Sequence, residues 1–170
     1  EVMLNIKIEN ETNDLQTVLV GIANDFGGTP KVQECYDPKS RIHITNGTFP
    51  KQKDILLEID AFIRILKKHN VDALRPSNIR GLNQIFTRDI AFVIQNKLII
   101  PNIIKNREKE IYALDDILKR ISNEDVFRMP LGARAEGGDV MLCNEYIFVG
   151  YSESEDFKKY ITARTNKQGL

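Results

Sequence analysis

The chain has 170 residues, of which 42% are hydrophobic and 28% charged, and its 24 Lys and Arg balance its 24 Asp and Glu. This composition is typical of one globular domain with its own core and excludes a disordered chain. A net charge of zero argues against nucleic acid or an anionic membrane as the main partner. No apolar stretch approaches the ~20 residues that a membrane span needs. Two cysteines, Cys35 and Cys143, are too few for a disulfide scaffold and indicate a reducing, cytoplasmic compartment.

The first half of the chain reads as two strands, a long loop, a helix and a short strand. Residues 2–8 alternate apolar and polar side chains, and residues 17–23 are β-branched and apolar, so both predict strands. Residues 24–49 contain several Gly and Pro and predict a loop. Residues 51–69 carry apolar side chains at three- and four-residue steps and end in cations, which predicts an amphipathic helix. A short strand is expected at 72–75.

The second half repeats this order. We expect a hairpin at 89–100, an amphipathic helix at 107–121, a short strand at 126–129, a second hairpin at 139–150, and a helix that starts near residue 166. The two hairpins begin about fifty residues apart. A period of this size indicates modules stacked around an axis, each of which needs its neighbours to bury its apolar faces.

Carboxylates stand where these hairpins begin. Asp89 opens the first hairpin, while Glu136 and Asp139 flank a Gly-Gly pair at the second. Around a shared axis the three would converge, and converging carboxylates require a cation, either a metal ion or a planar guanidinium. The glycines would let a ligand approach the backbone closely. The alternative is a glycine bulge whose carboxylates are simply solvated, and spacing alone leaves both interpretations open.

Other charged and reactive residues carry no prediction of catalysis. The mixed charge run at 105–109 predicts a solvated helix face. The sequence has no phosphate loop, zinc-ligand spacing or dinucleotide fingerprint, so we predict no cofactor and no metal.

Three stretches together resemble the guanidino-group-modifying superfamily: IFTRDIAFVIQNKLIIPNIIKNREKEI at 85–111, EGGDVMLCNEYIFVG at 136–150 and TARTNKQGL at 162–170. That group comprises arginine deiminases, dimethylarginine hydrolases and amidinotransferases, built on the five-bladed pentein β/α propeller. The opening NETNDLQTVLVG is also similar to the family's first strand. The resemblance implies an α/β fold in which residues 1–170 form a single domain. This domain would be a partial pentein propeller with about the first three of five ββαβ blades, the N-terminal portion of a longer enzyme.

The resemblance also implies roles for particular residues. Asp89 would grip the substrate guanidinium, Glu136 would be the second acidic group on it, and Asp139 would hold the loop or the general acid in place. Three further positions would contribute to substrate binding: Asn83 and Phe86 as pocket walls, and Arg164 facing the carboxylate end of the substrate.

In this family a cysteine attacks the guanidinium carbon and a histidine protonates the departing amine. Both lie C-terminal to the RTN stretch, beyond residue 170. The four His and Cys of this chain, which are Cys35, His43, His69 and Cys143, do not match those positions, and we assign none of them a catalytic role. The 170-residue chain alone is therefore predicted to be inactive.

The function implied is that of an amidinotransferase-like enzyme acting on arginine or a related compound through a cysteine-amidino intermediate. Alternatives are an arginine deiminase or dimethylarginine hydrolase, a non-catalytic pentein that binds a partner, and an α/β domain whose hairpins merely begin with acidic residues. The expected partner is a small guanidino compound, with no nucleic acid and no membrane. Uncovered blade edges would also allow a homo-oligomer.

Overall fold

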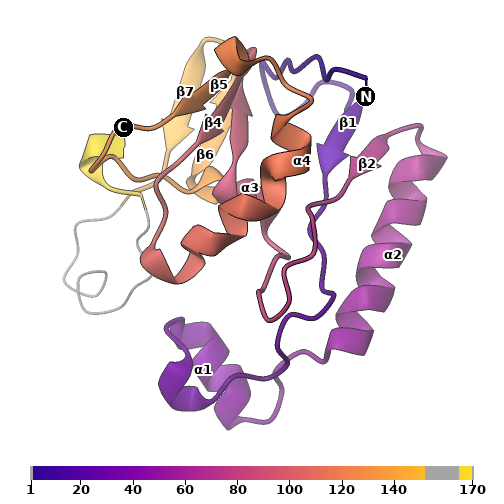
Figure 1. Ribbon diagram of the computed structural model, residues 1–170, viewed down its shortest axis with the longest axis vertical. Helices are drawn as coiled ribbons and strands as arrows, with labels where there is room; N and C mark the ends of the chain where they lie inside the picture. The colour runs from indigo at the N-terminus through magenta and orange to yellow at the C-terminus, as the bar shows by residue number, and fades with distance from the viewer. Residues whose placement is uncertain (1, 152–164, 170) are drawn as a thin grey trace.

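The computed structural model describes residues 2–151 and 165–169. Within them, three small sheets follow one another along the chain, β1-β2, β3-β4-β5 and β6-β7 (Figure 1). None of the helices in this part of the chain combines the length and apolar character needed to cross a bilayer.

The first sheet is a parallel pair joined by a helix. Strand β1 (Thr17–Leu19) pairs in parallel with β2 (Asp72–Leu74), and α2 (Gln52–Lys68) lies beside them (Figure 1). A parallel pair needs a crossover connection of this kind. The inner face of α2 packs through Leu66 against Val20 and Val71. The predictions of a helix at 51–69 and a strand at 72–75 are thus confirmed.

The predicted loop at 24–49 contains a helix, and the prediction is wrong there. Helix α1 (Pro38–Thr45) begins after Asp37, whose side chain accepts a hydrogen bond from the backbone N–H of Ser40 at 2.7 Å. Asp at the N-cap followed by Pro at the first helical position is a strong start signal. The sequence pattern did not predict this helix, because the helix has no apolar face and buries no residue.

The second sheet contains the first predicted hairpin. Its strands β3 (Phe92–Ile94) and β4 (Lys97–Ile100) are antiparallel, and β5 (Val126–Arg128) joins β4 in parallel. The hairpin and the short strand are confirmed. The first residues of the predicted hairpin form instead one helical turn, α3 (Thr87–Ile90), which includes Asp89.

The connection from β4 to β5 is mostly a 3₁₀ helix at Lys105–Leu114, followed by one α-helical turn, α4 (Asp115–Leu118). The predicted amphipathic α-helix at 107–121 is therefore wrong over most of its length. Side chains three residues apart eclipse in a 3₁₀ helix. This conformation puts Arg107 and Glu110 on the same, buried side.

The third sheet is the hairpin of β6 (Val140–Cys143) and β7 (Tyr146–Val149), as predicted. A 3₁₀ turn at Gly137–Asp139 precedes it. Strand β6 buries Val140 and Leu142, whereas β7 remains open to solvent, with Phe148 54% exposed. After the hairpin, a 3₁₀ turn at Lys167–Gly169 stands where a helix start was expected.

The N-terminal segment connects the sheets without forming a regular strand. Ile8 makes an isolated antiparallel bridge to Gln95, and Asn10 makes one to Cys143. The strand predicted at 2–8 is thus reduced to isolated pairings. The strand predicted at 17–23 is regular only at Thr17–Leu19.

Candidate functional site

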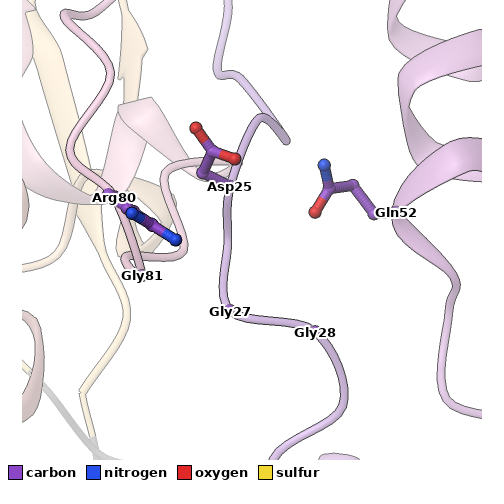
Figure 2. A pocket seen from close by; sticks show the side chains of 6 residues that line it. All are labelled: Asp25, Gly27, Gly28, Gln52, Arg80 and Gly81. Atoms are coloured by element: carbon purple, nitrogen blue, oxygen red, sulfur yellow. The ribbon is translucent and has the colours of Figure 1, made fainter.

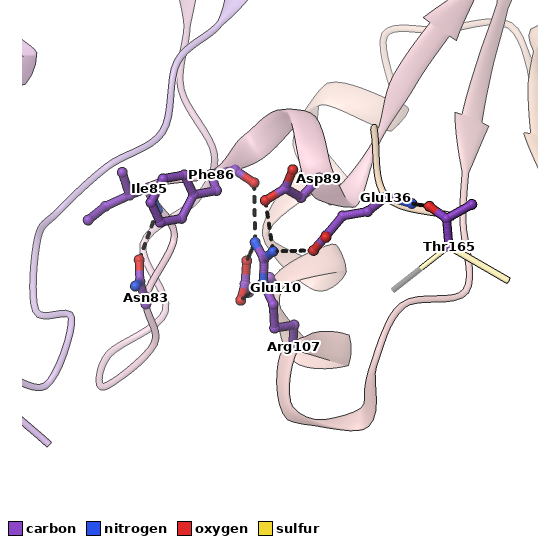
Figure 3. Close-up of polar contacts among 8 residues, drawn as sticks. All are labelled: Asn83, Ile85, Phe86, Asp89, Arg107, Glu110, Glu136 and Thr165. Atoms are coloured by element: carbon purple, nitrogen blue, oxygen red, sulfur yellow. Dashed lines mark hydrogen bonds and ion pairs between the residues drawn. The ribbon is translucent and has the colours of Figure 1, made fainter. Parts of the chain in front are cut away.

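A buried arginine gathers carboxylates from separate parts of the chain (Figure 3). Arg107 is 4% exposed. Its Nη1 donates to Asp89 Oδ2 at 2.9 Å and to Glu136 Oε1 at 2.8 Å. Its Nε and Nη2 donate to the two carboxylate oxygens of Glu110 at 2.8 and 2.7 Å, and Nη2 also donates to the carbonyl of Phe86 at 3.3 Å. All five N–H donors of the guanidinium are used. We call these four charged side chains the Arg107 cluster.

Two neighbouring glycines allow the turn that follows Glu136 to lie close to Asp89. A Cβ on Gly137 would overlap the carbonyl oxygen of Arg88, and a Cβ on Gly138 would lie 2.8 Å from Asp89 Oδ1. The turn at Gly137–Asp139 can therefore lie directly against the backbone of α3 only because Gly137 lacks a side chain, and Gly138 leaves room for the Asp89 carboxylate. This close approach explains why the second hairpin opens with Gly-Gly.

The Arg107 cluster carries a net negative charge. One guanidinium (+1) faces three carboxylates (−3), so the four side chains sum to −2. Burial alone would lower the pKa of Arg107, but the hydrogen bonds and charges of Glu110 and Asp89 outweigh it and hold the pKa above its ordinary value. Arg107 is consequently cationic at every physiological pH, and the remaining negative charge favours a second cation nearby.

Asp139 lies next to the cluster but does not contact Arg107. Its carboxylate accepts a hydrogen bond from the Thr165 hydroxyl, and the oxygen of that hydroxyl accepts one from the backbone N–H of Glu136 at 3.1 Å. Thr165 is itself buried. Asp139 is thus joined to the backbone of Glu136 through one side chain (Figure 3 shows the Thr165–Glu136 contact).

The other predicted site residues lie on the loop that leads into α3 or outside the described chain. Asn83 is exposed, and its Oδ1 accepts a hydrogen bond from the backbone N–H of Ile85 at 3.2 Å. Phe86 is 59% exposed. Arg164 falls outside the described residues, so its expected role stays a prediction.

Sequence reasoning missed Arg107 and Glu110. Both fall in or beside the charge run at 105–109, which was predicted to be a solvated face, and both are buried. A usable signal was present, because buried Ile103 and Ile104 precede the pair and buried Leu114 follows it. A charged pair bracketed by apolar residues on both sides is more consistent with an internal ion pair than with a surface.

Arg88, next to Asp89, connects three parts of the fold. Its guanidinium donates to both carboxylate oxygens of Glu11 at 2.7 and 3.1 Å, to the Gly137 carbonyl at 3.0 Å and to the Val140 carbonyl at 2.8 Å. The hydrogen bond from Arg88 holds the pKa of Glu11 below its ordinary value. Arg88 therefore fastens the N-terminal segment to the turn that carries Glu136.

The cysteines and histidines lie away from the cluster. Cys35 is buried and its thiol donates to the carbonyl of Asp37 at 3.5 Å, while Cys143 is exposed. The Nδ1 of His43 is paired with Thr48 Oγ1 at 2.9 Å, and His69 caps the end of α2. Within residues 2–151 and 165–169, no group of three or more His, Cys, Asp or Glu side chains is placed so that it could hold a metal ion.

Two open hollows lie outside the Arg107 cluster. One of about 340 Å³ lies between α4 and β5, and one of about 230 Å³ lies beside the start of α2 (Figure 2). The second is lined by Asp25, Gly27, Gly28, Gln52, Arg80 and Gly81. Asp25 is engaged there by Asn78, whose Nδ2 donates to it at 2.9 Å.

No protein-family profile matches the chain. The uncharacterized protein YkgA of Bacillus subtilis is 31% identical over 96 residues, which cover 55% of this chain and 33% of YkgA. Among solved structures, dimethylarginine dimethylaminohydrolase of Pseudomonas aeruginosa, complexed with citrulline, matches with a TM-score of 0.66 and 20% identity over 91% of this chain and 53% of that enzyme. The amidinotransferase SxtG of Microseira wollei, from saxitoxin biosynthesis, matches with a TM-score of 0.66 and 18% identity over 96% and 57%.

The N-terminal domain of ArgZ, a cyanobacterial arginine dihydrolase solved with its substrate, matches with a TM-score of 0.64 and 13% identity over 89% of this chain and 51% of that one. The chain therefore has the α/β fold shared by the guanidino-group-modifying enzymes of the pentein superfamily, as the sequence resemblance predicted. It spans about half the length of these solved structures and a third of YkgA.

Proposed function

We propose that this chain is the guanidinium-binding part of an amidinotransferase-like enzyme that acts on arginine or a related compound. Asp89 and Glu136 would hold the substrate guanidinium, and the nucleophilic cysteine and general-acid histidine would be contributed by sequence C-terminal to residue 170. In the complete protein these would be further blades of a pentein propeller, of which residues 1–170 supply about three.

One observation carries the proposal. Asp89, from the turn before β3, and Glu136, from the turn before β6, meet on a single guanidinium nitrogen. Buried carboxylates are costly unless a cation pairs with them. A planar cation with N–H donors in fork geometry suits two carboxylates that approach from different directions. The fold of guanidino-modifying enzymes makes a guanidino ligand the natural candidate.

The chemistry requires a protonated guanidinium, because its carbon is electron-poor only in that form. Carboxylates beside it keep it protonated. A cysteine thiolate would form a C–S bond to this carbon, and the C–N bond to the departing amine would break as the amine takes a proton from the histidine. Water or a second amine would then displace the thiolate. Within this chain, Asp89 and Glu136 would bind the substrate, and Asp139 would fix Glu136 through Thr165.

Hydrolysis is the second candidate reaction. The dimethylarginine dimethylaminohydrolase and the amidinotransferase match with the same TM-score of 0.66, so both reaction types occur on this backbone arrangement. In the complete protein, ornithine formation that depends on an added amine would support transfer, and citrulline formation would support hydrolysis. Arginine binding without turnover there would support the non-catalytic binding module.

Calorimetric titration of arginine into the 170-residue protein tests the binding role. Asp89→Ala should weaken the affinity, since a charge-assisted hydrogen bond contributes about 1.5–3 kcal/mol, roughly tenfold to a hundredfold. Asp125→Ala is the matched control, because Asp125 is also a partly buried aspartate in an ion pair, with Lys97 at 2.9 Å. Citrulline, the neutral counterpart of arginine, should bind weakly to the wild type. Equal heats from wild type and Asp89→Ala would count against the proposal.

A further inference from the structure

The open hollow of about 340 Å³ between α4 and β5 has the features of a second binding site. It is lined by Leu118 at the end of α4, by Asn123 in the turn before β5, and by Val126 and Arg128 of β5 itself. We propose that this hollow binds a small carboxylate with a short apolar body. The hollow shares no lining residue with the Arg107 cluster, so this inference does not depend on the proposed function.

The walls of the hollow belong to the apolar core. Side chains alternate along a strand, so Val126 and Arg128 lie on the same face of the second sheet. In the neighbouring strand β4, Leu98 and Ile100 are their partners in register, and both are buried in the core. Leu118 and Val126 pack against that core and are only partly buried. The hollow is therefore a place where the apolar face of the sheet reaches solvent.

Arg128 brings an unpaired charge to this apolar face. Among the described residues, its guanidinium forms no hydrogen bond and no ion pair. Asp125, an acid close to it in sequence, is engaged instead by Lys97 at 2.9 Å. A guanidinium carries five N–H donors and a charge that it does not lose in proteins. A free guanidinium beside an apolar wall therefore favours an anion that can also use the wall.

The lining residues favour a carboxylate among anions. The four of them include no acid, and Asn123 adds a side-chain amide that has no partner within the described part of the chain. The planar fork of Arg128 matches the two oxygens of a carboxylate, and Leu118 and Val126 suit a few methylene groups. Small-molecule sites span about 300–1,000 Å³, so this hollow suits a ligand of only a few carbons. Because the hollow is open to solvent, we expect dissociation constants in the millimolar range.

Arg128 has a rival role that needs no ligand. Strand β5 lies at the edge of the second sheet, with β4 as its one neighbour among the described strands. A charged side chain that points inward from an edge strand discourages pairing with a second chain. In that case Arg128→Gln would promote association of the protein and leave the binding of carboxylates unchanged.

Titration of butyrate into the 170-residue protein, at constant ionic strength, distinguishes the two roles. Backbone amide NMR signals of Asn123, Val126 and Arg128 should shift in a saturable manner. Arg128→Gln should weaken butyrate binding about fivefold or more, and it should fold because Arg128 is exposed. Arg80→Gln is the matched control, because Arg80 is an exposed arginine that lines the other hollow. Wild-type affinity for butyrate in Arg128→Gln would overturn the proposal.

Ligands that differ from butyrate in one property test the two halves of the site. Butyramide keeps the shape and lacks the charge, so it should bind more weakly than butyrate. Acetate keeps the charge and lacks most of the apolar body, so it should also bind more weakly. If butyramide bound as tightly as butyrate, Arg128 would not recognise the ligand. If acetate and chloride shifted the same signals as strongly as butyrate, the hollow would hold an adventitious ion only. Either result would overturn the proposal.

The titration also separates this site from the proposed function. Asp89→Ala, which should weaken arginine binding, should bind butyrate as wild type does. If wild type bound butyrate at the hollow but did not bind arginine, the proposed function would be wrong and the carboxylate site would be supported. If butyrate caused no saturable shift around the hollow in wild type, the carboxylate site would be wrong whatever the result with arginine.

Discussion

The hydroxyl oxygen of Thr165 accepts a hydrogen bond from the backbone N–H of Glu136 at 3.1 Å, and both residues are buried. The same hydroxyl donates to Asp139. One side chain from the RTN stretch therefore closes the turn that begins at Glu136, and it satisfies a buried backbone donor.

Replacing Thr165 by Val keeps the shape of the side chain and removes this link. The N–H of Glu136 would then be buried without its acceptor, which costs about 1–3 kcal/mol. We expect urea denaturation to show a loss of this size for Thr165→Val and a much smaller loss for Thr165→Ser. Thr45→Val is the control, because the Thr45 hydroxyl is exposed and bonded to the Arg41 carbonyl at 2.9 Å. A Thr165→Val protein as stable as wild type would contradict the role of this hydroxyl.

The two glycines of the EGGD turn should respond differently to Ala. A Cβ on Gly137 meets fixed backbone, so Gly137→Ala should cost more than ~2 kcal/mol of unfolding free energy through overpacking. A Cβ on Gly138 meets only the end of the Asp89 side chain, so Gly138→Ala should change stability little and weaken arginine binding. Gly150→Ala is the control, since its Cβ would find ordinary contacts at 3.8 Å or more. If Gly138→Ala bound arginine as tightly as wild type, a ligand bound at the Asp89 carboxylate would be contradicted.

The ion pair of Glu11 and Arg88 predicts a pH dependence of stability. The pKa of Glu11 is lowered from 4.5 in the folded protein, chiefly by its hydrogen bond to Arg88. Its contribution is therefore present above about pH 4.5 and lost as the pH falls through the lower, folded-state pKa. The pair is partly exposed, so we expect Glu11→Gln to cost only ~0.5–1 kcal/mol at pH 7 and nothing at the acid end.

Denaturant titrations at pH 7 and in steps below pH 4.5 measure the difference in free energy of unfolding between wild type and Glu11→Gln. Glu9→Gln is the control, because Glu9 pairs with Lys7 at 3.2 Å on the exposed surface. If the loss of unfolding free energy in Glu11→Gln grew toward low pH, the pH dependence that we assign to the Glu11–Arg88 pair would be wrong.

The 170-residue protein should release neither ammonia nor citrulline from arginine. Neither of its cysteines contacts the Arg107 cluster: Cys35 is buried and bonded to Asp37, and Cys143 lies at the end of β6. A colorimetric assay of both products at high protein concentration tests this expectation. If the protein turned over arginine and still did so after Cys35 and Cys143 were replaced by Ser, catalysis would not use a thiol of this chain. If either replacement abolished the turnover, that cysteine would be a nucleophile that we did not assign.

The elements with a clear period could be predicted from the sequence. The apolar spacing of α2 and the two hairpins β3-β4 and β6-β7 are local patterns, and each was found nearly at its observed position. The convergence of Asp89 and Glu136 could also be expected, because each stands just before a hairpin of a repeated unit. Both the apolar spacing and the repeated order of elements can be read directly from the sequence.

The cation that joins these carboxylates could not be predicted in the same way. Arg107 and Glu110 lie among charged neighbours, and the apolar residues on either side of them are the one local sign that the pair is internal. The 3₁₀ conformation that aligns them is favoured by contacts with Asp89 and Glu136, which are distant in sequence. Only the family resemblance distinguished Asp139 from the other two acids, because its partner Thr165 comes from another segment of the chain.

The spacing of the four members of the Arg107 cluster along the chain sets the loop-closure entropy of each contact. Arg107 and Glu110 are three residues apart, Asp89 precedes Arg107 by 18 residues, and Glu136 follows it by 29. Because this entropy cost grows with loop length, the Glu110 contact closes at the lowest cost and the Glu136 contact at the highest. Glu136, with the EGGD turn that it begins, is therefore the member expected to dock last as the chain folds.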